Sequence, residues 1–180
     1  MIVGLVRHYP VDLPYPSKRL VSGDEAAAWF AAYDEAPIVP GRTELGGIAW
    51  ERCVSSDQPR AVRTAELLFP APERIETRAE LREIALPAIS GQRLRLPFLW
   101  WAVWARLTWK LDSAAREEMA SAERRVQTVL DEVANRPERS VLIVSHGALM
   151  LRMKKELAKR GFQGPRFAYP RNGELYVFTL

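Results

Sequence analysis

The chain has 180 residues, of which 48% are apolar and 27% are charged, a composition that suits one domain with a substantial core and excludes a disordered chain. Lysine and arginine outnumber aspartate and glutamate by 26 to 22, a mild excess that suits an anionic small molecule at least as well as nucleic acid. The single cysteine, Cys53, excludes an internal disulfide and points to a reducing compartment, so we expect a cytoplasmic protein.

The first third of the chain is predicted to hold a strand and a capped helix. The apolar run Ile2–Val6 is typical of a buried strand, and no basic region or cleavage site of a signal peptide accompanies it. A proline-rich loop, Tyr9–Pro16, follows the strand. The next element is a helix over about Ser22–Tyr33, because Ser22 stands at the N-cap with Glu25 three residues later.

A second strand and helix are predicted near the middle of the chain. Arg52–Ser55 is expected to form a short strand, and a helix over about Pro59–Phe69 follows, with its proline at the first helical position. Ser56 or Asp57 is expected to cap this helix. A further strand is predicted near Arg74–Thr77.

The last third of the chain continues the alternation. It is predicted to hold a long polar helix over about Ala114–Asn135, a buried strand at Val141–Val144 and a helix over Ala148–Arg160. The alternating pattern of Glu174–Thr179 predicts a final strand, antiparallel at the edge of the sheet. Together these elements predict a three-layer αβα sandwich with a mostly parallel central sheet, in one domain over residues 1–180.

A tryptophan-rich segment, Leu96–Trp109, is predicted to be a small helical insertion at about residues 85–112. Its uncharged stretch, Leu96–Ala105, has ten residues, whereas a membrane-spanning helix needs about 20. A transmembrane protein is therefore excluded at this stage. A helix that is apolar on nearly all sides is normally buried.

The chain contains only two histidines, and each directly follows a predicted buried strand. His8 ends the run GLVRH and His146 ends the run LIVSH. Parallel strands end at one edge of a sheet, where open α/β folds bind their ligands, so we expect the two imidazoles to converge there. The alternative is two unrelated histidines in a loop or in the core.

Two arginines are expected at the same edge of the sheet. Arg7 precedes His8, and Arg60 lies in the first turn of the second helix, where free backbone N–H groups favour an anion. Gly147, after His146, likewise opens a helix. Because a guanidinium group binds phosphate in bidentate fashion, this edge is predicted to bind a tetrahedral oxyanion.

Four motifs resemble those of the histidine phosphatase superfamily, which includes the cofactor-dependent phosphoglycerate mutases. LVRH at Leu5–His8 resembles the family's RH(G) motif, and SSDQPRAVRTA at Ser55–Ala65 resembles its SxxxRAxxTA motif. LREI at Leu81–Ile84 resembles its LxE motif, and VLIVSHG at Val141–Gly147 resembles its VxHG motif. The motifs follow the family's order and span residues 5–147.

The resemblance implies a metal-independent phosphomonoesterase that uses a phosphohistidine intermediate. His8 would be the nucleophile, and Glu83 would protonate the leaving alkoxide and then activate water. The groups that would bind and stabilise the phosphoryl oxygens are Arg7, Arg60, His146 and Gly147. No metal and no other cofactor are expected, because the arginines and histidines supply the positive charge.

Two departures from the family pattern concern the pocket. Tyr9 stands where the family has glycine after the nucleophilic histidine, so Tyr9 could narrow the pocket or contact substrate. After the LxE motif the chain reads IALPAISG, with Pro87 where the family has glycines and a further glutamate. Asp12 and Asp57 are therefore alternatives to Glu83 as the acid.

In the family, insertions at this point of the chain form a cap over the active-site mouth. The resemblance therefore implies that Trp100 and Trp101 belong to a lid or a pocket wall. The same segment could form a homodimer interface. The flanking basic residues also leave a peripheral membrane contact open; they are Arg93, Arg95, Arg106 and Lys110.

Besides the peripheral membrane contact, three functions stay open at the level of sequence. The first is hydrolysis of a small phosphorylated molecule, with no nucleic-acid partner expected. The second is a phosphomutase of the same chemistry, although mutases of this family resemble longer chains. The third is a non-catalytic protein on this fold that recognises a phosphorylated partner, which the changes at Tyr9 and after Glu83 suggest. The physiological substrate depends on pocket walls that the motifs do not cover.

Overall fold

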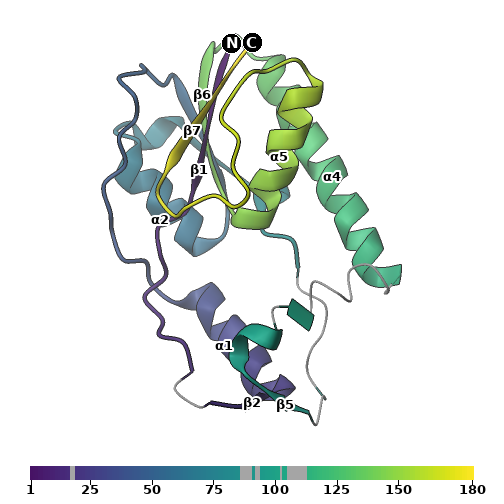
Figure 1. Cartoon of the computed structure of the whole chain (residues 1–180). Coiled ribbons are helices and arrows are strands. Elements are labelled where there is room, and N and C mark those ends of the chain that lie inside the picture. The colour runs from purple at the N-terminus through teal and green to yellow at the C-terminus, as the bar shows by residue number, and fades with distance from the viewer. Residues whose placement is uncertain (17–18, 86–90, 92–93, 102, 105–112) are drawn as a thin grey trace.

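A five-stranded sheet runs through the centre of the structure, a computed structural model that describes all residues except 17–18, 86–90, 92–93, 102 and 105–112 (Figure 1). The strand order is β4-β3-β6-β1-β7. The strands are β1 (Ile2–Arg7), β3 (Arg52–Ser56), β4 (Ile75–Arg78), β6 (Ser140–Ser145) and β7 (Leu175–Thr179). Each predicted strand is therefore confirmed to within about two residues at each end.

The direction of the strands decides where their ends meet. β1, β3, β4 and β6 pair in parallel, and β7 pairs antiparallel with β1 at the edge, as its alternating sequence predicted. In the register of the two central strands Val6 faces Val144 and Arg7 faces Ser145. The residues that follow, His8 and His146, therefore leave the sheet side by side.

Helices and loops cover both faces of the sheet, which confirms the three-layer architecture. On one face α4 (Ser113–Ala134) and α5 (Gly147–Lys159) pack their apolar residues against β1 and β6. On the other face α2 (Pro59–Leu68) packs with the loop around Trp50. The apolar stripes of these helices bury against strands whose central residues are buried on both sides, the usual arrangement of a parallel sheet.

The two predicted helix caps had different outcomes. Ser22 and Glu25 form the predicted capping box at the start of α1 (Gly23–Glu35). The prediction that Ser56 or Asp57 caps α2 is wrong, because the N-cap is Gln58 and it makes no side-chain cap. Ser56 instead accepts a hydrogen bond from the Gln58 backbone N–H, and the carboxylate of Asp57 binds Arg82.

A small cap lies beyond the carboxyl ends of the parallel strands (Figure 1). It contains α1, a two-stranded sheet of β2 (Val21–Ser22) and β5 (Arg95–Leu96), and the helical residues 98–101 and 103–104. These parts share a separate core of Val21, Ala26, Phe98 and Trp101. The helix α1 therefore belongs to the cap and does not cover a face of the central sheet.

The tryptophan-rich segment is only partly buried. Phe98 and Trp101 lie in the core of the cap, and the Trp101 indole N–H donates to the Val21 carbonyl oxygen at 3.0 Å. In its described part Leu99, Trp100, Val103 and Trp104 are exposed by 41–66%, so the lid, the homodimer interface and the membrane contact stay predictions. The other residues discussed for this insertion lie outside the described part of the chain; they are Pro87, Arg93, Arg106, Trp109 and Lys110. No helix in the described ranges has both the length and the apolarity to cross a membrane.

Candidate active site

The two histidines meet at the carboxyl edge of the sheet. The ring centroids of His8 and His146 lie 5.2 Å apart. Both side chains are buried, with exposed fractions of 2% and 0%. They come together because β1 and β6 are hydrogen-bonded neighbours in parallel register. The alternative of two unrelated histidines is therefore wrong.

His8 has a defined tautomer. Its Nδ1 lies 2.6 Å from the carbonyl oxygen of Tyr9, which can only accept, so Nδ1 carries the proton. The other ring nitrogen, Nε2, then holds a lone pair. Burial, together with the charges of Arg60 and Arg7, lowers the pKa of His8 to about 3 although the Tyr9 hydrogen bond opposes this shift. The imidazole is thus neutral and has one unprotonated nitrogen at pH 7.

His146 is also held neutral. Burial is the main cause that lowers its pKa well below the ordinary value, followed by the charges of His8, Arg60 and Arg7. Both of its ring nitrogens are buried and have no hydrogen-bond partner in the described part of the chain. A neutral imidazole has one N–H, so His146 can donate one hydrogen bond to a group that enters beside His8.

Arg7 approaches the histidines from the end of β1. Its Nη1 donates to the Pro170 carbonyl oxygen at 3.2 Å, and its guanidinium carbon lies 4.8 Å from the ring centroid of Tyr169. The tyrosine ring shields one face of the cation. The Nε of Arg7 is buried and no described residue accepts its hydrogen bond.

Arg60 reaches the site from the first turn of α2 and is 4% exposed. Its Nη1 donates to Asp34 at 2.8 Å, its Nη2 donates to Gln58 at 3.3 Å, and its guanidinium carbon lies 5.4 Å from the ring centroid of Tyr33. Its Nε is buried without an acceptor among the described residues. Arg63, three residues later, is exposed and pairs with Glu66, so only Arg60 belongs to the site.

The unsatisfied polar groups indicate what this edge binds. Buried N–H groups in native proteins almost always have an acceptor, so the Nε groups of the two arginines and the His146 ring point to a bound acceptor. A tetrahedral oxyanion offers several oxygens to donors that converge from different sides. No cluster of three or more histidine, cysteine, aspartate or glutamate side chains suited to a metal ion occurs within the ranges that the structure describes.

Glu83 lies at the amino-terminal end of α5. Its carboxylate accepts hydrogen bonds from the backbone N–H groups of Ala148 and Leu149 at 3.1 Å each, and from its own neighbour Ile84 at 3.0 Å. Since Ala148 is two residues after His146, these contacts place the carboxylate at the first turn of α5. A carboxylate at a helix N-terminus is stabilised by the helix dipole.

Side chains from the loop before α2 and from α4 hold the loop that carries Glu83. Gln58 Oε1 accepts from the Glu83 backbone N–H at 3.1 Å and also from Arg60. Arg82 makes two hydrogen bonds to Asp57, at 2.6 and 2.7 Å. Arg125, on α4, donates to the carbonyl oxygens of residues 80 and 82. Asp57, one of the two alternative acids, is thus paired, and Arg82 holds its pKa below the usual range.

The structure gives the other predicted site residues different surroundings. Tyr9 lies in the core between α2 and the sheet, and its hydroxyl is 3.1 Å from Thr43. Trp101 lies in the core of the cap, and Trp100 is 60% exposed on its surface. Asp12 is exposed in the loop after β1, where its backbone N–H donates to Pro37. Gly147 begins α5, and a Cβ there would lie 2.8 Å from the hydroxyl of Tyr169.

Three residues of the site have no signal in the sequence. Tyr33 and Asp34 come from the end of α1, and the Tyr33 ring centroid lies 6.4 Å from that of His8. Tyr169 comes from the loop before β7 and covers Arg7. None of them follows a strand or lies in a recognised motif, so only the folded chain brings them to the histidines.

The site predicts a pH dependence of stability between pH 7 and pH 5, to which the two histidines contribute most. Their pKa values are lowered in the folded state, so unfolded histidines bind protons that folded ones do not. Stability is fully present above pH 6.5 and falls with decreasing pH by about 1.4 kcal/mol per pH unit for each histidine. Urea unfolding in phosphate-free buffers at pH 7, 6 and 5 measures this slope.

A variant that carries His8→Gln and His146→Gln is the control for that slope, because it has no histidine left. Its unfolding free energy should fall much less between pH 7 and pH 5, because only the carboxylates of lowered pKa then remain, and they lose their contribution mainly below pH 5. Equal slopes in the variant and the wild type would contradict the neutral, buried state of the two imidazoles.

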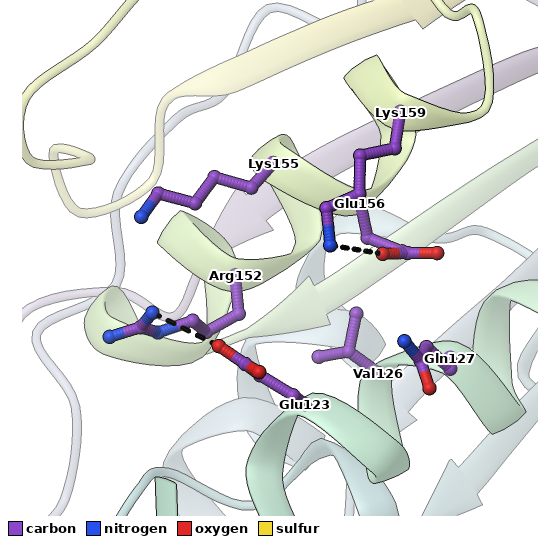
Figure 2. Close-up of a pocket in the computed structure, with 7 residues that line it drawn as sticks. All are labelled: Glu123, Val126, Gln127, Arg152, Lys155, Glu156 and Lys159. Atoms are coloured by element: carbon purple, nitrogen blue, oxygen red, sulfur yellow. Dashed lines mark hydrogen bonds and ion pairs between the residues drawn. The ribbon is translucent and has the colours of Figure 1, made fainter. Parts of the chain in front are cut away.

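A shallow hollow between α4 and α5 lies apart from this site (Figure 2). It is lined by Glu123, Val126, Gln127, Arg152, Lys155, Glu156 and Lys159. Arg152 pairs with Glu123 at 3.3 Å and Lys159 pairs with Glu156 at 3.4 Å across its lining. Most of its charges are thus paired within the protein, and none of its lining residues belongs to the histidine site.

Comparison with known proteins agrees with this geometry. The profile of the histidine phosphatase superfamily (branch 1) matches residues 42–180. The match includes Arg60, Glu83 and His146, whereas Arg7 and His8 precede it. Among curated proteins there is no significant match.

Several solved structures share the fold. A mycobacterial glucosyl-3-phosphoglycerate phosphatase is 20% identical with a TM-score of 0.60 and covers 98% of this chain and 88% of its own. Bacillus stearothermophilus YhfR is 19% identical with a TM-score of 0.58, over 88% of this chain and 80% of its own. An Escherichia coli protein described as a putative alpha-ribazole-5'-P phosphatase is 16% identical with a TM-score of 0.53, over 98% of this chain and 89% of its own. These similarities show a common fold.

Proposed function

Because the chain belongs to the histidine phosphatase superfamily, we propose that it is a metal-independent phosphomonoesterase that forms a phosphohistidine on His8. One observation carries the proposal. His8 is buried and neutral, its Nδ1 proton is fixed on the Tyr9 carbonyl oxygen, and the buried Arg60, the half-buried Arg7 and His146 surround it. That arrangement presents the Nε2 lone pair to an anion bound at the same edge. Two of the similar structures are described as phosphatases, which supports hydrolysis as the reaction class.

The first step transfers the phosphoryl group to His8. The phosphoryl oxygens are held by Arg7, Arg60 and His146, which neutralise charge and orient the phosphorus toward Nε2. The Nε2–P bond forms while the bond from phosphorus to the ester oxygen breaks. The departing alkoxide takes a proton from the carboxyl group of Glu83, which becomes a carboxylate.

The second step returns the enzyme to its starting state. The Glu83 carboxylate takes a proton from a water molecule, and the water oxygen attacks the phosphorus of the phosphohistidine. The N–P bond breaks, inorganic phosphate leaves, and His8 regains its neutral form with the proton still on Nδ1. No redox partner or external proton source is needed over the full cycle.

The assignment of Glu83 makes a prediction about leaving groups. Glu83→Gln should lower kcat/KM for an alkyl phosphate by about 100-fold or more but lower that for an activated aryl phosphate little. The constant kcat/KM covers the steps up to the phosphoenzyme, and in those steps only the alkoxide needs a proton to leave. Rates for a series of phosphomonoesters with increasing leaving-group pKa measure this difference. Glu80→Gln is the matched control, since Glu80 lies on the same loop and its side chain pairs with Arg78.

Equal lowering of kcat/KM for both classes of substrate would contradict the role of Glu83 as the acid. If the melting temperature also fell, that result would assign Glu83 to its helix-capping contacts with Ala148 and Leu149. To deliver a proton, the Glu83 carboxyl group has to give up one of those contacts.

The proposed reaction is tested by phosphate release from p-nitrophenyl phosphate and from an alkyl phosphate, with EDTA present, between pH 4 and pH 8. Steady release of inorganic phosphate, together with a phosphoenzyme in acid-sensitive and base-stable linkage, supports the proposal. Transfer of the phosphoryl group within a substrate, without release, would instead identify a mutase.

A second candidate function is supported by the hydrogen bonds of Glu83. In the described conformation its carboxylate accepts three backbone hydrogen bonds, so the site could bind a phosphorylated partner without hydrolysing it. Tight binding of phosphate with no turnover of any tested ester would favour this function.

We also propose a cytoplasmic location, to which the free and buried thiol of Cys53 is suited.

A further inference from the structure

Three aromatic rings form a row that leads from His8 to the surface of the cap. The Tyr33 ring centroid lies 6.4 Å from that of His8, and the Trp29 centroid lies 5.3 Å from that of Tyr33. Tyr15 stacks on Trp29 with a centroid distance of 5.5 Å and an interplanar angle of 11°. We call Tyr33, Trp29 and Tyr15 the aromatic row. It begins at the nucleophile and ends at a ring that is 68% exposed.

The row is tied to the phosphoryl site at its inner end. The guanidinium group of Arg60 lies over the Tyr33 ring, and the charges of both Arg7 and Arg60 act on the Tyr33 hydroxyl. Burial nevertheless raises the pKa of Tyr33, so its hydroxyl stays protonated near neutral pH. A molecule whose phosphoryl group is bound by the two arginines therefore has this tyrosine directly beside it.

The outer end of the row packs against Phe98 and Pro14. The Trp29 indole N–H donates to the Pro14 carbonyl oxygen at 2.9 Å, and the Phe98 ring lies 4.7 Å from Trp29 and 5.6 Å from Tyr15 between centroids. These contacts fix the orientation of Trp29 and Tyr15 before any ligand binds. Tyr15 lies outside the buried core of the cap, so its exposed ring is not needed to fill that core.

We propose that the aromatic row is a binding surface for an aromatic or heteroaromatic group in the alcohol part of the substrate. The proposal rests on the function proposed above, because it extends the phosphoryl site to the leaving group. A planar ring stacks on aromatic side chains through its faces and edges, whereas a saturated ring of the same size gains only the burial of apolar surface. The preorganised rings also reduce the entropy that binding has to offset.

Binding of two matched phosphonates tests the proposal without requiring turnover. 4-Phenylbutylphosphonate and 4-cyclohexylbutylphosphonate carry the same charged group and rings of similar size, only the first ring is aromatic, and their chains are long enough to reach past Tyr33. We expect the full chain to bind 4-phenylbutylphosphonate about 10-fold more tightly in isothermal titration calorimetry. The preference should fall to about twofold or less in Tyr15→Leu and in Trp29→Leu.

Trp100→Leu is the matched control, because Trp100 is an exposed tryptophan of the same cap that does not belong to the row. Its preference should equal that of the wild type. Tyr15→Leu changes an exposed side chain, so it stays informative if Trp29→Leu lowers the melting temperature. Equal affinity of the wild type for the two phosphonates would overturn the proposal. It would also be overturned if the preference for the aromatic phosphonate were lost in Trp100→Leu but kept in Tyr15→Leu.

Kinetics separate this proposal from the proposed function. 4-Phenylbutyl phosphate and 4-cyclohexylbutyl phosphate release primary alcohols of nearly equal acidity, so a difference in kcat/KM reports ring recognition and not leaving-group reactivity. Turnover of both esters at equal kcat/KM would support the phosphatase and overturn the binding surface. Selective binding of 4-phenylbutylphosphonate without hydrolysis of either ester would support the binding surface and overturn the phosphatase.

Discussion

The variant His8→Ala is expected to reduce the turnover of every phosphomonoester by about 1,000-fold or more. The reason is that His8 Nε2 is the atom that accepts the phosphoryl group, and the proton on Nδ1 keeps it available at all pH values near neutrality. The other histidine cannot replace it as the attacking group, because the two rings are fixed 5.2 Å apart on different strands. Single-turnover quench experiments with labelled substrate should show no phosphoenzyme in the variant.

His146→Gln provides the comparison for that experiment. It removes an imidazole from the same buried edge but leaves His8 in place, so slowed formation of the phosphoenzyme is expected, not its absence. Circular dichroism and the melting temperature check that each variant is folded. A phosphoenzyme that forms in His8→Ala at more than a tenth of the wild-type amount would contradict the role of His8.

The second large effect is expected at Arg60. Arg60→Met should reduce kcat/KM by about 100-fold to 1,000-fold, the usual cost of removing one donor that stabilises charge in the transition state. Methionine keeps much of the volume of this buried side chain. The ion-pair partner Asp34 is 53% exposed, so its carboxylate stays hydrated when the guanidinium is lost. The variant is therefore expected to fold, and steady-state kinetics with inhibition by inorganic phosphate measure the effect.

Arg63→Met is the matched control for Arg60→Met. Arg63 lies on the same helix, its side chain is 62% exposed, and it pairs with Glu66 at 3.0 Å. Its replacement should change kcat/KM by less than about twofold, because an exposed ion pair contributes little. Similar losses in the two variants would contradict the specific role of Arg60 in phosphoryl binding.

The pairing of Arg60 with Asp34 also affects how the site binds its ligand. Asp34 occupies Nη1 of Arg60, while Nε has no acceptor in the described part of the chain. A bound phosphoryl oxygen can accept a hydrogen bond from Nε without displacing another group. At Nη1 it either shares the guanidinium group with the Asp34 carboxylate or displaces that carboxylate. Since both groups are anionic, Asp34 weakens the attraction of Arg60 for phosphate and holds the guanidinium in position between ligands.

Much of the fold could be predicted because the sheet depends on local patterns. Runs such as Ile2–Val6 and Val141–Val144 are apolar throughout, which is typical of strands buried on both faces. The capping box at Ser22 and the alternation of the last strand also depend on residues close together in the chain. The cap could not be predicted in this way, because β2 pairs with β5 across more than 70 residues of sequence and each has two residues.

The same distinction applies to the candidate site. His8, His146, Arg7 and Arg60 were predicted together because each follows a strand or opens a helix, and parallel strands bring those positions to one edge. Of the predicted pocket residues, the side chains of Tyr9 and Trp101 lie in cores and that of Trp100 is exposed, because an aromatic residue near a motif can equally fill a core or lie on the surface. Whether the Glu83 carboxylate faces a ligand or a helix end is decided by the packing of its loop on α5.

The sequence by itself determined the parallel sheet and the convergence of two histidines and two arginines at its carboxyl edge. It did so because strand direction and strand ends follow from patterns within a few residues of each other. Only the tertiary structure decided that Tyr33 and Asp34 meet Arg60, that Glu83 binds the first turn of α5, and that an aromatic row extends from His8. Those contacts join segments far apart in the chain, and their free energy depends on packing geometry that no local pattern encodes.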